Sequence, residues 1–357
     1  MISSFFVDRR AVLPWIAGAA VLFIVCASIF ALILTGRTRR ATAPVVSTNT
    51  DVPATSTTSL VPRHLDGLLV TPDLANVAPW AVMIDHQVDA RPQSGVSAAR
   101  IVIESPVEGG ITRLMAFFAP TSTLPEIGPI RSARPYFVDW AQGWHAAYFH
   151  VGGSPEALEH ITALGGRFKD ANEMMNGWAF WRDDGRVAPH STMTNGERME
   201  SLAERKGFAS STLPAAWHFF DEATSTKLGE VTRANIPYGG SYNVVWKFDK
   251  DRNIYGRNVS GRRALDRDGS AIESNNIIII KTEAQILDDK GRLRLRTTGS
   301  GDAMAYRDGN KFSLRWRRTP GEPIRFETVD GIEYLLRPGV TWIEVTTDDM
   351  MFAGLEK

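Results

Sequence analysis

The first hydrophobic stretch of the chain, positions 11–35, carries no charged side chain and consists mainly of Ala, Val, Leu, Ile and Phe. About 20 such residues span a bilayer as a helix, whereas the hydrophobic part of a cleaved signal peptide covers only roughly 7–15. The length therefore predicts a single transmembrane helix, with residues 1–36 forming a cytoplasmic N-terminus and a membrane anchor. Pro14 falls near the start of this helix, where it removes no internal hydrogen bond.

Residues 37–63 form a polar linker rich in Thr, Ser and Pro. Such a composition cannot bury a core and is typical of a solvated spacer. The spacer favours a single-pass protein of the cell membrane whose C-terminal portion lies outside the cytoplasm. Arginines flank the hydrophobic stretch on both sides, so the charge bias leaves a cytoplasmic C-terminal portion as the alternative.

Strand-like and helix-like patterns alternate between residues 64 and 225. Short runs of β-branched and aromatic residues predict strands, and hydrophobic residues three and four apart predict amphipathic helices. Strands are expected at 80–84, 99–104, 112–119 and 146–151, and helices at 135–144 and 155–164. Gly109 and Gly110 separate two of the strands, which predicts an antiparallel hairpin. We therefore expect a mixed sheet with helices packed on it, an α/β domain at 64–225.

From residue 231 onward the helical pattern gives way to strands. They are expected at 242–248, 276–281, 293–297, 304–316, 324–336 and 341–345. Asp308-Gly309 and Asp330-Gly331 each lie between β-rich runs, which is a strong hairpin signal. We therefore expect a mainly antiparallel β domain at 231–357. The fold class predicted for the whole chain is α+β, with the transmembrane helix first, the mixed-sheet domain second and the β domain last.

Charge and cysteine content exclude several classes of protein. Of the 357 residues, 40 are Lys or Arg and 40 are Asp or Glu, so the chain lacks the basic surplus that non-specific nucleic-acid binding uses. The single cysteine, Cys26, excludes an internal disulfide and a zinc site built from several thiolates. His145 and His150 lie five apart, so along a continuous strand they would point to opposite faces and could not share a metal. We expect no metal and no cofactor, and any anion site must be local.

The segment 128–137, GPIRSARPYF, holds the densest cluster of chemically informative residues. Arg131 and Arg134 flank Ser132, and Pro135 stands where the next helix is expected to begin. The first amides of that helix have no intrahelical partner and are expected to face the same side as the guanidinium groups. Cationic forks beside free amides favour oxyanions, so the segment predicts an anion site.

A second turn shows related features. After a strand that ends at His150, Gly152 and Gly153 let a ligand approach the backbone, and Ser154 caps a helix that starts at a proline. The same residues also occur in ordinary strand-to-helix connections, which is the alternative interpretation. Because two such turns occur in one domain, we expect them to form one shared site.

Acidic and basic side chains gather just upstream of the arginine turn, at Asp85, Arg91, Glu104, Glu108 and Arg113. Glu104 and Arg113 are expected to face each other as an ion pair across the hairpin. Alternatively, Asp85 and Glu108 act as general acid and base, or accept hydrogen bonds from a sugar-like ligand.

Two histidines are candidates for the expected pocket. His150 stands at the glycine turn and His190 follows a proline in APHST. Each is suited to donate a proton or to serve as a neutral hydrogen-bond partner. His150 is therefore also a catalytic candidate beside Asp85 and Glu108.

Several motifs resemble those of a known family. In the first domain they are WAVMID, RPQSG, VEGGITR, IGPIRSARPYFVD and HVGGSPEAL, and in the second IYGR, NNIIII, TTGSGDAMAYRDGNKFSLRW and RPGVTWIEV. Together they are similar to the YerB-like lipoprotein family, whose N- and C-terminal parts are classed as domains of unknown function. The resemblance covers nearly everything after the linker. It implies a membrane-attached protein of the bacterial cell envelope and supplies no activity.

Two positions depart from the family pattern. The residues before Cys26 are Phe23, Ile24 and Val25, whereas a lipidated cysteine usually follows a small residue, which favours the helix over a lipid as the anchor. His86 follows Asp85 where the family more often has Asn.

The sequence thus predicts a membrane-anchored extracytoplasmic protein that binds an anionic or glycan-type envelope ligand. The expected ligand-binding residues are Arg91, Glu104, Glu108, Arg113, Arg131, Ser132, Arg134, His150, Gly152, Gly153, Ser154 and His190. Two alternatives remain open: a hydrolase or transferase acting on glycan or phosphodiester bonds, and a scaffold for a protein partner. Nucleic acid is not an expected partner.

Overall fold

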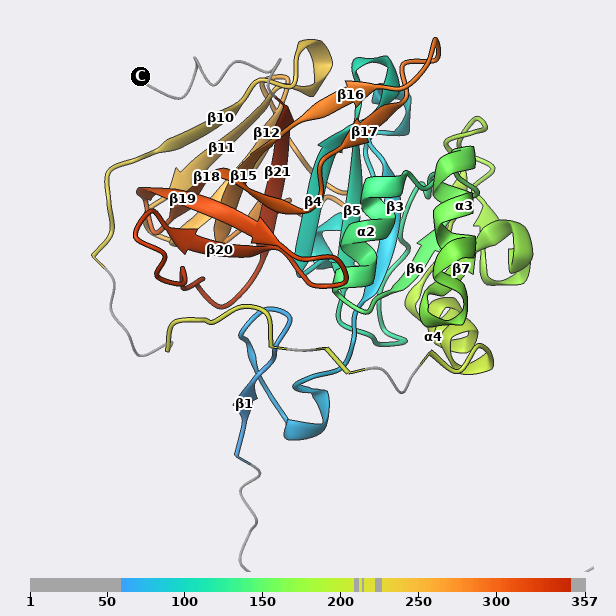
Figure 1. The fold of residues 1–357 in the computed structure, drawn as a ribbon, viewed down its shortest axis with the longest axis horizontal. Helices are drawn as coiled ribbons and strands as arrows, with labels where there is room; N and C mark the ends of the chain where they lie inside the picture. Colours follow the sequence, from blue (N-terminus) through green and yellow to red (C-terminus); the bar gives the residue numbers. More distant parts are fainter. Residues whose placement is uncertain (1–58, 209–211, 214, 222–226, 348–357) are drawn as a thin grey trace, which may run out of the picture. The chain divides into compact units, whose positions relative to one another are not determined.

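A ten-stranded mixed sheet organises the fold (Figure 1). The structure, a computed structural model, describes residues 59–208, 212–213, 215–221 and 227–347. The strand order is β20-β19-β18-β15-β21-β4-β5-β3-β6-β7. In chain order these strands are β3 (Trp80–Asp85), β4 (Ile101–Pro106), β5 (Thr112–Phe118), β6 (Ala147–His150), β7 (Lys169–Asn172), β15 (Asn276–Thr282), β18 (Gly299–Arg307), β19 (Asn310–Arg318), β20 (Arg325–Thr328) and β21 (Thr341–Thr347).

Smaller sheets and three α-helices complete the described part of the chain. A five-stranded sheet contains β10 (Arg233–Ile236), β11 (Val244–Asp249), β12 (Ile254–Val259), β13 (Arg262–Arg263) and β14 (Glu273–Ser274). Two-stranded sheets pair β1 (Val61–Pro62) with β2 (Leu69–Val70), β8 (Trp181–Arg182) with β9 (Thr192–Met193), and β16 (Ala284–Ile286) with β17 (Leu293–Leu295). The helices are α2 (Pro135–Gly143), α3 (Pro155–Leu164) and α4 (Gly196–Arg205).

Side chains of the central strands are buried on both faces of the large sheet. Along β15, Ile277 and Ile279 belong to one hydrophobic core, and Ile278 and Ile280 belong to the other. Successive side chains in a strand alternate between faces, so an unbroken hydrophobic run is stable only where both faces are covered. The run of four isoleucines therefore reflects the position of β15 inside the sheet.

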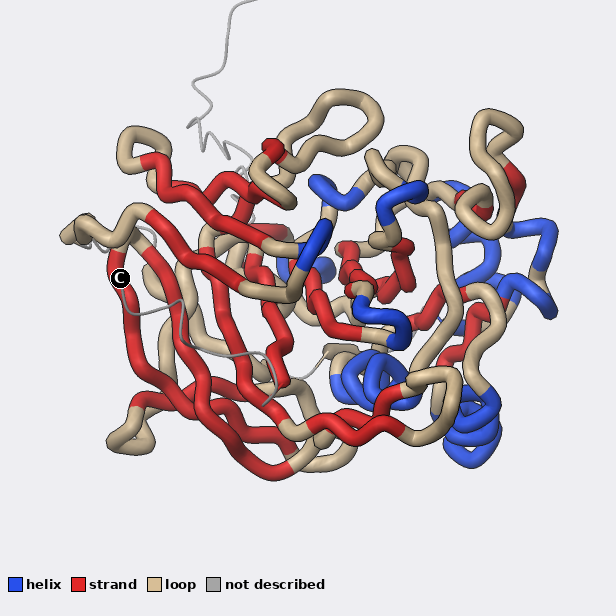
Figure 2. Tube along the Cα trace, turned by 90° about the horizontal axis from the view of Figure 1, so that it is seen from above, coloured by secondary structure: helices blue, strands red, loops and turns tan. Residues whose placement is uncertain are grey.

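Different layers cover the two faces. On one face, α2 packs Phe137 and Trp140 into the core that contains Met83 of β3. On the other face, the five-stranded sheet contributes Trp246 and α4 contributes Met199. Figure 2 shows strands filling one side of the described fold and helices gathered at the other. This layering creates an interior between the two sheets, where the buried polar residues described below lie.

The large sheet takes strands from both ends of the described chain. β21 pairs in parallel with β4 on one side and with β15 on the other. In this register Glu344 lies opposite Glu104. Strands predicted within 64–225 and within 231–357 therefore share one sheet.

The predicted hairpin between β4 and β5 is present, but its register corrects one expected contact. The two strands pair antiparallel, with Glu104 opposite Leu114 and Arg113 opposite Ser105. Because neighbouring residues of a strand point to opposite faces, Glu104 and Arg113 do not form the expected cross-strand ion pair. The expected pairing of Glu104 with Arg113 was therefore wrong by one residue along β5.

The hairpin at Asp308-Gly309 is confirmed. β18 and β19 pair antiparallel with Arg307 opposite Asn310, so Asp308 and Gly309 alone connect the two strands. Both have positive φ angles, 54° and 69°, as a tight turn of this kind requires. A side chain at Gly309 would lie 2.6 Å from the Phe248 ring, so only glycine fits there.

The predicted fold class needs correction. The described residues are mostly β, because α2, α3 and α4 have only 9, 10 and 10 residues and every other long element is a strand. Hydrophobic periodicity predicted most strands of the large sheet, but missed β7, and it could not show that β21 joins β4 in one mixed sheet. Among the described residues no helix is long and hydrophobic enough to cross a membrane. The predicted transmembrane helix at 11–35 lies outside those residues, and the structure gives it no support.

Candidate functional site: an arginine-lined cavity beside a buried carboxylate pair

The structure brings the two predicted turns together. Ala133 forms a parallel bridge with Gly153, and its amide donates to the Gly152 carbonyl at 3.0 Å. In the same way the Val151 amide donates to the Arg131 carbonyl at 3.1 Å. The arginine turn and the glycine turn are therefore neighbours, as the sequence predicts.

The guanidinium groups of the arginine turn are engaged by carboxylates of the protein. Arg131 Nε lies 3.0 Å from Asp85 Oδ2, and Arg134 Nε donates to Glu108 Oε2 at 2.9 Å. Burial raises the pKa of Glu108, but hydrogen bonds from Arg134 outweigh it and leave the pKa below its usual range. Arg113 donates to the Ser132 carbonyl at 2.8 Å, and burial lowers its pKa to about 10. This side of the turn is an internal ion network.

The polar groups of the glycine turn also have partners. The Gly152 amide donates to Asn172 Oδ1 at 3.0 Å, and Ser154 Oγ accepts from the Ala157 amide at 3.3 Å. His150 is buried, with Nδ1 2.6 Å from the Gly152 carbonyl and Nε2 2.8 Å from Asp170 Oδ1. A ligand at this turn has to displace existing hydrogen bonds, and its binding here stays a prediction.

His190 lies beside Asp85, the carboxylate that also pairs with Arg131 of the arginine turn. Its Nδ1 is 2.6 Å from Asp85 Oδ2, the same oxygen that Arg131 approaches. The Asp85 carboxylate is buried, and the Arg131 guanidinium and the His190 ring are its side-chain contacts at this oxygen. His190 borders a cavity together with Arg91, Arg186 and others.

A second polar network lies between the two sheets, around Glu104. Thr112 Oγ1 donates to Glu104 Oε1 at 2.6 Å, and His86 Nδ1 lies 3.2 Å from the same oxygen. Arg257, from the five-stranded sheet, donates to Glu104 Oε2 and packs over the Trp342 ring at 4.7 Å. All of these charged groups are at most 1% exposed. Glu104 and Arg257 thus form a buried ion pair that joins the two sheets.

Glu344 is the partner of Glu104 across the strands, and its environment differs. Its oxygens accept from Trp246 Nε1 at 2.7 Å and contact the Tyr238 hydroxyl at 2.9 Å. Burial, with the Glu104 charge beside it, raises the pKa of Glu344 to about 8. Burial also raises the pKa of Glu104, but Arg257 and His86 outweigh it and the pKa is about 2. The pair therefore holds one proton at neutral pH, on Glu344.

His86 completes this network in its neutral form. Burial lowers its pKa to about 4, because the effect exceeds the attraction of Glu104. Its other ring nitrogen, Nε2, lies 3.5 Å from Arg257 Nη1. The neutral ring therefore lies between the Glu104–Arg257 ion pair and a cavity that the ring helps to line.

A cavity of about 740 Å³ opens beside His86 and Arg257, and we call it the arginine cavity. Five arginines line it, at positions 91, 257, 262, 263 and 267, against one acid, Asp266. Asp266 already accepts hydrogen bonds from the amides of Val96 and Ser97, at 3.1 and 2.7 Å. The lining is therefore strongly cationic.

The arginines of this cavity differ in how far they are neutralised. Arg263 and Arg267 pair with Glu273 and Asp183 at the rim, and Arg257 pairs with Glu104. Within the described residues, no carboxylate lies within ion-pair distance of Arg91 or Arg262.

Two N–H groups at this cavity are buried without a hydrogen-bond partner in the described part of the chain. They are Arg91 Nη2 and Arg257 Nε. Arg91 is held in place by its other nitrogens, which donate to the carbonyls of His86 and Ser241 at 3.2 and 2.8 Å. Burial, with Arg257 nearby, lowers the pKa of Arg91. Two fixed cations from different segments thus each keep one N–H group without a hydrogen-bond partner at one cavity.

Sequence reasoning identified Arg91 as a site residue but missed the other four arginines of the cavity. A usable signal was present, because four arginines lie within the segment 257–267. Their clustering could be recognised only with the pairing of β12 and β13, which brings Arg257 and Arg262 to one side of the small sheet.

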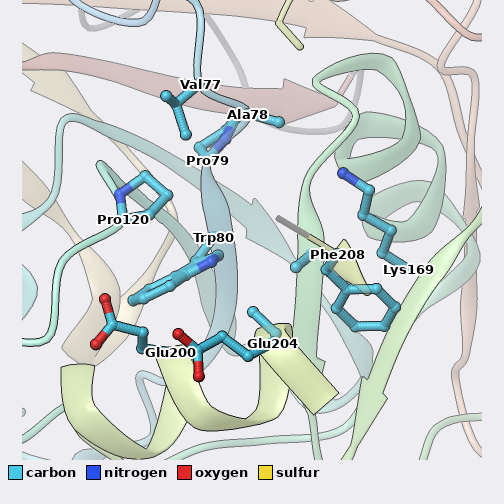
Figure 3. A pocket seen from close by; sticks show the side chains of 11 residues that line it. Val77, Ala78, Pro79, Trp80, Pro120, Lys169, Glu200, Glu204 and Phe208 are labelled. Carbon is cyan, nitrogen blue, oxygen red and sulfur yellow. The ribbon is translucent and has the colours of Figure 1, made fainter. Parts of the chain in front are cut away.

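A smaller hollow of about 160 Å³ lies between β3, β7 and α4 (Figure 3). Figure 3 shows Glu200 and Glu204 of α4 beside the Trp80 ring, with Lys169 across the hollow. Burial lowers the pKa of Lys169 to about 8. Two carboxylates and a small volume disfavour an anion here.

Among the described residues, no cluster of three or more His, Cys, Asp or Glu side chains could hold a metal ion.

Comparison with known proteins gives consistent matches over most of the chain. Residues 65–209 match the family model described as "Protein of unknown function (DUF3048) N-terminal domain", and residues 234–343 match its C-terminal domain. The chain is 31% identical over 291 residues to "Putative lipoprotein YerB" of Bacillus subtilis (strain 168), covering 80% of this chain and 86% of that protein. The crystal structure of YerB from Bacillus subtilis superimposes with a TM-score of 0.70 at 30% identity, covering 79% of this chain and 95% of that one.

Proposed function

Because the chain belongs to the DUF3048 family, whose description assigns no activity, we propose its function from the site: a membrane-associated protein of the cell envelope that binds an anionic ligand in the arginine cavity. The localisation is supported by the name of the Bacillus subtilis relative, "Putative lipoprotein YerB". The anionic class of the ligand is supported by the five arginines that line this cavity.

The observation that carries the proposal is the arginine-rich lining of the cavity, in which Arg91 and Arg257 each keep one N–H group without a partner. Arg113 and Arg131 also have an unpartnered Nε, but neither of them lines this cavity. A buried donor without an acceptor costs about 1–3 kcal/mol, and more for a charged group. Native proteins leave few such groups, and those that remain call for an explanation. Oxyanions of a ligand supply the missing acceptors at both positions.

The guanidinium chemistry narrows the ligand to a phosphate- or carboxylate-type anion. Arg91 is fixed by two backbone carbonyls, so its free nitrogen is already oriented before a ligand arrives. Planar guanidinium forks match the spacing of oxygens in such anions, and a fixed fork loses less entropy on binding. Arg262, which is exposed, adds long-range attraction at the entrance.

Arg91→Gln is expected to weaken the binding of orthophosphate by at least about tenfold, because a charge-assisted hydrogen bond contributes about 1.5–3 kcal/mol. Isothermal titration calorimetry at low salt measures the loss. Arg131→Gln serves as the comparison, since Arg131 is paired with Asp85 and does not line this cavity.

Arg262→Gln is a second variant that leaves the interior untouched, and it is expected to weaken phosphate binding by a smaller factor. Equal affinity of all variants, or no binding by the parent protein, contradicts the proposal. A loss confined to Arg131→Gln contradicts the position of the site and restores the arginine turn as its location.

A further inference from the structure

A second cavity adjoins the arginine cavity. It measures about 690 Å³, and we call it the His190 cavity after the residue that borders it with Asp89, Arg91, Pro92, Arg186 and Arg267. Arg91, Pro92 and Arg267 line both cavities. The two hollows therefore meet along one shared wall.

The His190 cavity is cationic as well. Arg186 donates to the carbonyls of Ala90 and Pro92, at 2.9 and 2.5 Å, and so braces the loop that carries the shared wall. Together the two cavities carry six arginines, at 91, 186, 257, 262, 263 and 267, and two acids, Asp89 and Asp266. Four of the six pair with carboxylates of the protein, and Arg91, on the shared wall, is one of the two that do not, so an unpaired cation borders both cavities.

The size of the two cavities favours a ligand longer than a single oxyanion. Pockets of roughly 300–1,000 Å³ hold ligands of drug size, and each of these cavities is within that range by itself. A single oxyanion between Arg91 and Arg257 leaves most of the space empty. A chain that continues past the shared wall fills both.

The linings lack the feature that single-stranded nucleic acids require. Proteins that bind such strands stack the bases on Phe, Tyr or Trp side chains. Among the described residues that line the two cavities there is no Phe, Tyr or Trp. The Tyr242 ring packs against Arg91 with its centroid 4.8 Å from the guanidinium carbon, but it lines neither cavity.

We propose that the two cavities form one groove for a linear polyanion that carries repeated phosphate groups and no stacking bases. Poly(alditol phosphate) and inorganic polyphosphate share this chemistry. The inference rests on the proposed function, since the first phosphate occupies the arginine cavity. It adds that successive phosphates cross the shared wall and lie in the His190 cavity.

Val187 allows a test that removes no contact. It lines the His190 cavity and is 82% exposed, so a substitution there leaves the fold intact. Val187→Asp places a negative charge in the cavity, and Val187→Asn is the matched neutral control. Calorimetry and salt titration are carried out on the parent and both variants with orthophosphate, oligo(glycerol phosphate), inorganic polyphosphate and oligo(dT) of similar charge.

The parent is expected to bind the longer phosphate chains at least about tenfold more tightly than orthophosphate, with a steeper loss of affinity on adding salt. Val187→Asp is expected to abolish most of that gain and to leave orthophosphate affinity unchanged, while Val187→Asn retains the gain. A preference for one of the two phosphate chains identifies the source of the ligand.

Three outcomes overturn the inference. If orthophosphate binds but longer phosphate chains bind no more tightly, the two cavities do not form one groove, and the proposed phosphate site in the arginine cavity is unaffected. If oligo(dT) binds as tightly as the base-free chains, the ligand class is wrong. If Val187→Asp and Val187→Asn behave alike, the second cavity takes no part. Failure of orthophosphate to bind defeats the proposed function as well.

Discussion

Arg257→Leu is expected to lower the free energy of unfolding by about 3–5 kcal/mol at pH 7, the cost typical of leaving one member of a buried ion pair alone. The partner, Glu104, is fully buried, and its pKa of about 2 depends on the Arg257 charge. Without that cation Glu104 stays ionised alone or takes up a proton, and either change costs free energy of folding. Its other contacts, Thr112 and His86, are neutral at this pH and cannot replace the cation. Urea denaturation followed by circular dichroism measures the change.

Two further variants make this prediction specific. Adding Glu104→Gln to Arg257→Leu removes the unpaired charge, so the double variant is expected to regain at least half of the loss. Arg252→Leu breaks an exposed ion pair with Glu273, whose atoms are 2.6 Å apart, and is expected to cost less than about 1 kcal/mol. If Arg257→Leu costs no more than Arg252→Leu, the buried network is not a structural element of the fold.

Glu344→Gln is expected to gain stability relative to the parent protein as the pH rises from about 5 to 8. The folded-state pKa of Glu344 is about 8, above the ordinary value of 4.5. Its contribution is therefore fully present below pH 4.5 and is lost as the pH rises through 8, by roughly 1.4 kcal/mol per pKa unit. Gln cannot ionise, and its amide can hydrogen-bond Tyr238 and Trp246 in place of the protonated acid.

The quantity to measure is the difference in unfolding free energy between Glu344→Gln and the parent at several pH values. Glu104 and His86 have lowered pKa values, so they add losses of stability as the pH falls, toward 2 and through 4 respectively. Both proteins share those losses, and they cancel in the difference. A difference that stays constant between pH 5 and 8 contradicts a shared proton on this carboxylate pair.

Local sequence signals predicted the elements that depend on neighbouring residues. Pro135 begins α2, Ser154 caps α3, and Asp308-Gly309 closes the β18–β19 hairpin, each at the predicted position. These features require only the conformational preference of one or two residues. The two predicted turns are also neighbours, because the arginine turn runs along β3, and β3 pairs with β6, the strand that ends at the glycine turn.

Features set by distant pairing could not be predicted from local patterns. The parallel alignment of β21 with β4 places Glu344 beside Glu104, and nothing near either residue in the sequence indicates it. The partners of Arg131 and Arg134 are likewise fixed by the fold, which supplies Asp85 and Glu108. A cluster of arginines in sequence therefore did not show which of them are neutralised and which face a cavity.

A soak of phosphate-free and sulfate-free crystals in tungstate tests the central claim most directly, because this oxyanion resembles phosphate and its position can be read from anomalous scattering. The account predicts an anomalous peak in the arginine cavity, within hydrogen-bond distance of Arg91 Nη2 and Arg257 Nε. A peak confined to the turns at Arg134 and Ser154, or no peak at either place, contradicts it.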